Sequence, residues 1–177
     1  MTKKSHIILI LFLAVLFISC QNEGSKTINN QLPISVSPET LKIPDKGGRK
    51  LRGQVLYMPV YSNIPHLKKQ DYNLSAFLAI HNTDLTHRIN ITKVYYFNTD
   101  GKLIKNFISS DHQVQPLATK IFSIPKEDQS GAGANFLVEW IANQQVNEPL
   151  IESVMKDLSG NKGISFLSQG RIIREIE

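Results

Sequence analysis

Cysteine is nearly absent from this sequence, since Cys20 is the only one in 177 residues. A lone cysteine forms no intramolecular disulfide, and the chain offers no Cys/His cluster for a structural zinc ion. Hydrophobic residues make up 41% of the chain and charged residues 20%. This composition is typical of one globular domain and excludes collagen-like, coiled-coil and strongly disordered proteins.

Long basic stretches are also missing. No Lys/Arg run is longer than a pair such as Lys68 and Lys69, and Arg49, Lys50 and Arg52 form a short cluster. The formal net charge of +5 falls to +3 when Lys3 and Lys4 are left out, because the remaining chain has 18 basic and 15 acidic side chains. A nucleic-acid surface needs a larger basic stripe than this, so we expect no nucleic-acid partner.

Common catalytic motifs are also missing from the sequence. The sequence contains no GxSxG, HExxH, Walker or CxxC motif. Residues Ser153 to Lys156 match the S-x-x-K motif of penicillin-recognising enzymes, but the partner motifs are missing and we interpret the match as chance. We therefore expect a protein that is not an enzyme.

No apolar run is long enough to span a membrane. The longest one, the twelve residues from Ile7 to Ile18, follows Lys3 and Lys4. As a helix it would be about 18 Å long, against a hydrocarbon core of about 30 Å. A basic start followed by a short apolar run predicts a signal peptide over residues 1–19.

The end of this run, Ser19-Cys20, resembles the lipobox of bacterial lipoproteins, although Phe17 stands where Leu is more usual. The resemblance implies cleavage after Ser19, a covalent lipid on Cys20 as the only expected cofactor, and a membrane anchor. The alternative is an ordinary secretory signal with an incidental cysteine. Gln21 in place of Asp favours the outer membrane over the inner one, with the folded domain in the periplasm or at the cell surface.

Residues 20–48 are rich in Asn, Ser, Lys, Pro and Gly, which predicts a flexible tether. The alternative for Leu41 to Ile43 is a short extra strand.

Residues 49–177 contain short β-branched and aromatic runs separated by turns, and this pattern predicts a single domain. The Asp100-Gly101 pair predicts a tight hairpin, and Trp140 is expected to anchor the core. The expected strands are Leu51 to Val60, Tyr72 to His81, Ile89 to Asn98, Lys102 to Ile108, Thr119 to Ile124, Asn135 to Ala142, Ile164 to Ser168 and Ile172 to Ile176.

A different pattern covers residues 148–158. Leu150, Ile151, Val154, Met155 and Leu158 recur at helical spacing after Asn147, a good N-cap, and before Gly160. This pattern predicts one short crossover helix. Seven or eight strands with one helix favour an all-β antiparallel sandwich of immunoglobulin-like type over a closed barrel.

Several longer runs, among them Gly133 to Trp140 and Val146 to Leu150, resemble a family of exported bacterial proteins known as domain of unknown function 3124. The resemblance extends from about Tyr57 to Ile173. It implies an envelope protein, often anchored by a lipid, and it carries no activity, substrate or catalytic residue.

Two clusters are candidate sites. A strand meander would bring Asp84, His87, Asp111 and His112 to one end of the domain, where they could form a divalent-metal or acid/base site of a small hydrolase. The alternative is that these are ordinary solvated loop residues. Glycan binding through exposed rings is a third hypothesis, and it would use Tyr57, Tyr61, Tyr95 or Tyr96.

The function expected from the sequence is therefore that of a lipid-anchored envelope protein, a non-catalytic module that binds an envelope protein or polysaccharide.

Overall fold

The structure is a computed structural model, and it describes residues 52–65, 71–159 and 163–177. These residues form twelve β-strands and no helix. None of them belongs to a helix with the length and apolar character needed to cross a membrane. The predicted signal peptide, Cys20, the tether and the Leu41 to Ile43 segment lie outside the described residues.

The larger sheet has six strands, and every neighbouring pair in it is antiparallel. The predicted hairpin joins two of its strands, with Gly101 at a φ of 75°, the left-handed region that glycine enters freely. In order across the sheet the strands are β12 (Arg171–Ile176), β1 (Arg52–Pro59), β9 (Asn135–Ala142), β5 (Ile89–Phe97) and β6 (Leu103–Asn106), while β7 (His112–Val114) also pairs with β5.

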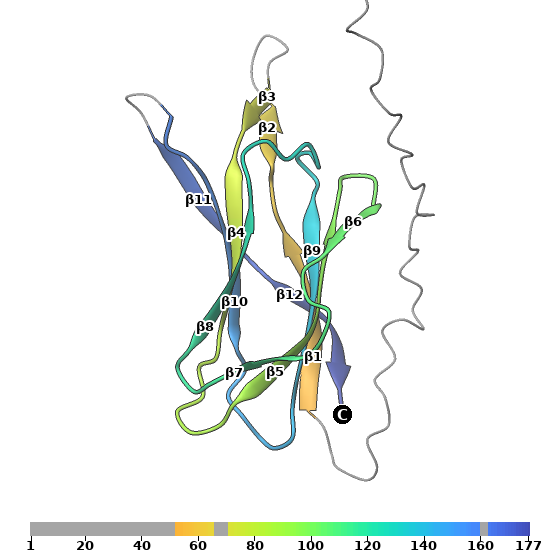
Figure 1. Cartoon of the computed structure of the whole chain (residues 1–177), viewed down its shortest axis with the longest axis vertical. Helices are drawn as coiled ribbons and strands as arrows, with labels where there is room; N and C mark the ends of the chain where they lie inside the picture. The colour runs from red at the N-terminus through yellow and green to blue at the C-terminus, as the bar shows by residue number, and fades with distance from the viewer. Residues whose placement is uncertain (1–51, 66–70, 160–162) are drawn as a thin grey trace, which may run out of the picture. The chain divides into compact units, whose positions relative to one another are not determined.

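The smaller sheet has four antiparallel strands, and a two-stranded ribbon accompanies it (Figure 1). The four are β11 (Ile164–Gln169), β10 (Leu150–Asp157), β4 (Ser75–His81) and β8 (Thr119–Ile124), and the ribbon pairs β2 (Asn63–Pro65) with β3 (Asp71–Asn73). The expectation of an all-β, antiparallel fold is confirmed.

Both sheets contribute side chains to one hydrophobic core. Met58 and Phe136 come from the larger sheet, and Leu78 and Met155 come from the smaller one. Trp140 belongs to the same core, as predicted. Strands β1 and β9 approach closely at Gly53, where an added Cβ would lie 2.1 Å from the Trp140 carbonyl oxygen. Only glycine fits at this position.

The predicted helix over residues 148–158 is wrong, because residues 150–157 form strand β10. Burial alternates along this strand, with Ile151, Ser153, Met155 and Asp157 turned inward. Two of these four inward residues are polar, which hides the two-residue period of a strand and leaves an apolar pattern that looks helical. The inward polar side chains find partners that are distant in sequence: Ser153 Oγ donates to the Pro59 carbonyl at 2.9 Å.

The predicted number of strands, seven or eight, is also too low, since the described residues contain twelve. Strands β2 and β7 have three residues each and give no detectable pattern. The expected strand from Tyr72 to His81 is divided at Leu74, whose N–H leaves the ladder and donates to the Ser62 carbonyl at 2.8 Å.

Candidate functional site

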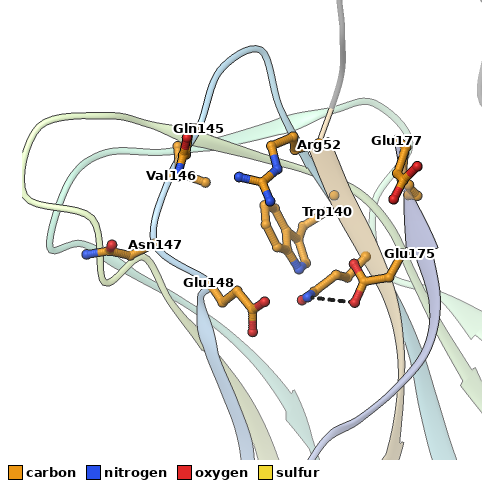
Figure 2. Close-up of a pocket in the computed structure, with 11 residues that line it drawn as sticks. Arg52, Trp140, Gln145, Val146, Asn147, Glu148, Glu175 and Glu177 are labelled. Atoms are coloured by element: carbon orange, nitrogen blue, oxygen red, sulfur yellow. Dashed lines mark hydrogen bonds between the residues drawn. The ribbon is translucent and has the colours of Figure 1, made fainter.

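An open pocket of about 810 Å³ lies where β1 begins and β12 ends (Figure 2). Three segments that are distant in sequence line it together with Trp140 of β9. They are residues 52–54 of β1, residues 145–148 of the β9–β10 connection and residues 175–177 at the end of β12. Antiparallel pairing of β1 with both β9 and β12 brings these segments to the same end of the sheet.

Trp140 is the buried wall of this pocket, and its side chain leaves one polar atom unsatisfied. The residue is only 3% exposed, and its indole Nε1 has no hydrogen-bond partner among the described residues. In Figure 2 the nitrogen edge of the ring is turned toward the space between Glu148 and Glu175. A buried donor without an acceptor costs about 1–3 kcal/mol, so this N–H is a strong candidate for binding an incoming oxygen.

Gln54 and Glu175 line the pocket, and Gln54 lies opposite Trp140 in the β1–β9 pair. Gln54 and Glu175 face each other across the β1–β12 pair, and Gln54 Nε2 donates to Glu175 Oε1 at 3.3 Å. This distance lies beyond the usual range for N–H···O hydrogen bonds, so the contact is weak and can be exchanged for a better one.

The charges of the pocket are unbalanced. Among the described residues, Glu148, Glu175 and Glu177 line it together with one basic residue, Arg52, so these four side chains carry a formal charge of −2. None of the three carboxylates takes part in an ion pair within the described part of the chain. The pocket is therefore acidic on a chain whose net charge is +5.

Asp84, one of the residues singled out from the sequence, organises the loops next to this pocket. Its Oδ1 accepts the backbone N–H groups of Thr86 and His87 at 2.9 and 2.8 Å, and its Oδ2 accepts that of Asn147 at 2.9 Å. These bonds, led by the one from Thr86, hold the pKa of the Asp84 carboxyl well below its usual range. Asp84 thus ties the β4–β5 connection to the segment that carries Glu148.

A second bond strengthens the same link. Thr83 Oγ1 donates to the Glu148 carbonyl at 2.6 Å. The backbone at Glu148 is therefore fixed from the β4–β5 loop, while its side chain remains exposed to solvent in the pocket.

The structure brings together two of the four residues proposed as a metal or acid/base site. His87 Nδ1 lies 3.3 Å from Asp84 Oδ1, and His87 lines a second open pocket of about 420 Å³. Asp111 and His112 do not line that pocket; His112 begins β7 and pairs with Ile91 of β5. Among the described residues no group of three or more His, Cys, Asp or Glu side chains could hold a metal ion.

The four tyrosines considered for glycan binding have different environments. Tyr57 is 40% exposed, and Tyr95 is half-buried. Tyr61 packs on Phe166, with ring centroids 5.9 Å apart. Tyr96 is fully buried, and its hydroxyl donates to Asp128 Oδ1 at 2.8 Å. Burial raises the pKa of Tyr96 and removes its ring from any glycan-binding surface.

The residues of the acidic pocket carry no motif, and sequence reasoning did not find them. Gln54, Glu148 and Glu175 come from three distant segments, and only strand pairing brings them together. One signal was available, since the run from Val146 to Leu150 contains Glu148 and belongs to the family resemblance.

The described residues are thus an all-β protein of antiparallel sheets with an acidic pocket at one end. The chain belongs to a family of proteins of unknown function, DUF3124, whose model matches residues 53–173. This confirms the resemblance seen in the sequence. A crystal structure of Thermotoga maritima 1070 is similar over 67% of this chain and 92% of its own length, with a TM-score of 0.43 and 11% identity. No curated protein matches the chain.

Proposed function

We propose that this protein is a non-catalytic binding module, held at the bacterial cell envelope by a lipid on Cys20, whose ligand site is the acidic pocket around Trp140. The observation that carries the proposal is the buried, unsatisfied indole N–H of Trp140, which lines an open pocket together with carboxylates that form no ion pair among the described residues. Polar groups without partners at a concave surface are typical of ligand sites.

The finer fold assignment belongs to this proposal. We infer an immunoglobulin-like β-sandwich, because both antiparallel sheets contribute to one core. In such sandwiches the loops gather at the two ends and carry the binding residues, while the sheets act as a rigid scaffold. The pocket at the start of β1 has the position that this architecture favours.

The role of Asp84 supports binding over catalysis. Its two carboxylate oxygens already accept backbone N–H groups from two loops, so little of its hydrogen-bonding capacity is left for a substrate. His87 contacts the same carboxylate. We infer that the pair shapes the end of the domain rather than acting as acid and base.

The anchor and the location rest on the sequence of residues 1–21. A lipid on Cys20 would place the domain in the periplasm or at the cell surface, and Gln21 favours the outer membrane. The ligand would then be a component of the envelope, either carried by a protein or polysaccharide or free in that compartment.

Photo-crosslinking in intact cells tests the binding site. A photoreactive residue is placed at Gln145, an exposed residue of the pocket, and, as the matched control, at Glu127, an exposed residue of the β8–β9 connection that does not line it. We expect a reproducible adduct from position 145 and none from position 127. No adduct from position 145, or the same adduct from both positions, would contradict the proposal.

A further inference from the structure

We propose that the pocket around Trp140 selects a small organic cation, a compound that carries an ammonium group next to a hydroxyl or carbonyl oxygen. This inference rests on the proposed function and names the ligand class for the same pocket. It rests on the negative charge of the pocket, on the unsatisfied indole N–H of Trp140 and on the contacts that hold the pocket residues in place.

Charge sets the first requirement. Glu148 and Glu175 reach the pocket from two different segments, and neither forms an ion pair with a basic side chain of the described residues, although Arg52 also lines the pocket. Figure 2 shows their carboxylates on either side of the nitrogen edge of Trp140. A ligand ammonium can donate to both, and hydrogen bonds between charged groups are the stronger kind. An anion would be repelled by the same two groups.

The indole N–H sets the second requirement. Trp140 Nε1 can only donate, so it needs an acceptor, and a simple cation has none. The ligand must therefore present an oxygen close to its cationic group. Compounds with this pair of groups include amino sugars and amino alcohols.

Gln54 connects the two requirements. Gln54 lies opposite Trp140 in the β1–β9 pair, and its amide donates a long hydrogen bond of 3.3 Å to Glu175. We infer that the ligand ammonium replaces the Gln54 amide at Glu175, and that the ligand oxygen reaches Nε1 once this amide has moved. Binding would then give the Trp140 indole N–H the hydrogen-bond acceptor that it lacks in the free protein.

Size and support favour a small molecule. A pocket of about 810 Å³ lies within the range of small-molecule sites. The backbone at both acidic residues is held in place. Thr83 donates to the Glu148 carbonyl and Asp84 accepts the neighbouring Asn147 N–H, while Glu175 is paired with Gln54 in the β1–β12 ladder. Such a prearranged site loses little conformational freedom when a ligand binds.

The chain supplies its own reporter, because Trp140 is its only tryptophan. The test titrates the purified full-length protein with glucosamine under conditions in which the amine of glucosamine is protonated. Binding is followed by tryptophan fluorescence and by the single indole N–H signal in NMR spectra. Glucose has the hydroxyls without the cation, and putrescine has the cations without an oxygen.

We expect saturable binding of glucosamine that moves the indole N–H signal and weakens as salt is added. Glu148→Gln and Glu175→Gln should each weaken it about tenfold, as loss of one charge-assisted hydrogen bond predicts, while the control Glu127→Gln leaves it unchanged. Equal binding of glucose or putrescine, unchanged binding by the two pocket variants, or no binding of glucosamine would overturn the ligand class.

These outcomes can be separated from a failure of the proposed function. Crosslinks from position 145 in cells, together with no charge-dependent binding in solution, would keep the pocket as the binding site and reject the cationic ligand. Absence of crosslinks would reject the binding site itself.

Discussion

At the scale of single residues, the carboxylate of Glu139 is buried and bound by several donors. The residue is 2% exposed, and Lys93 Nζ donates to both of its oxygens at 2.8 and 2.9 Å. Thr92 Oγ1 donates to the same carboxylate at 2.7 Å, and an Arg174 nitrogen lies 3.5 Å away. This carboxylate has been removed from water, so it depends on these partners.

We expect Lys93→Met to lower the free energy of unfolding by about 3 kcal/mol, because it leaves a buried charge without its main partner. Urea unfolding measures this loss, with Lys102→Met, an exposed lysine, as the control. The double variant Lys93→Met with Glu139→Met should be more stable than Lys93→Met alone. A double variant as unstable as the sum of the two single changes would contradict this account.

Asp84 gives a prediction that depends on pH. Its folded-state pKa is lowered, whereas in the unfolded chain an aspartate titrates at about pH 4. The stabilisation from its ionised form is therefore complete above about pH 4 and is lost as the pH falls below that value. Asp84→Asn keeps the size of the side chain but removes the Oδ2 acceptor of the Asn147 N–H.

We expect Asp84→Asn to be less stable than the native chain at neutral pH, and the difference to shrink as the solution is made acidic. Urea unfolding at several pH values checks this, and Asp100→Asn, in an exposed turn, is the control. A difference that stays constant with pH would show that the charge of Asp84 is not the cause.

At the scale of elements, strand β10 separates two neighbouring residues that a helix would bury alike. Met155 is fully buried in the core, while Val154 lies on the opposite face and is partly exposed. We expect Met155→Ala to cost about 2–5 kcal/mol and Val154→Ala less than about 1 kcal/mol. Urea unfolding of the two variants compares them directly, and equal losses would argue against the strand.

The same strand shows why the fold was only partly predictable. Thr119–Ile124 and Asn135–Ala142 were predicted with their correct bounds, because β-branched and aromatic residues fill them. In β10 the inward positions of Ser153 and Asp157 break the alternation. They are tolerated because Ser153 bonds Pro59 on β1 and Asp157 bonds Lys126 at 2.8 Å, contacts that only the folded chain creates.

The candidate site was also predictable only where its residues are close in sequence. Asp84 and His87 were expected to lie near each other, and they are only three positions apart in the sequence. The pocket residues could not be found in this way, because Gln54 and Glu175 are 121 residues apart and meet through the pairing of β1 with β12. No local pattern of the sequence shows that these two distant strands pair with each other.

At the scale of the whole molecule, the folded domain and its expected anchor are separate parts of the chain. The family match covers residues 53–173 and does not include Cys20. Loss of the lipid should therefore leave the folding of the domain unchanged and alter only its location. A single acyl chain binds membranes weakly and reversibly, so stable anchoring takes a second acyl chain or another membrane contact.

Cys20→Ser removes the thiol that would carry the lipid. We expect the variant to leave the membrane fraction and become soluble in the envelope, while the native chain pellets with membranes and incorporates radiolabelled palmitate. Ser19→Ala keeps a small residue before the cysteine and serves as the control, which should still be lipidated. Membrane pelleting of Cys20→Ser at the native level would contradict the lipid anchor, and an intact urea-unfolding transition in the released variant would show that the domain folds without it.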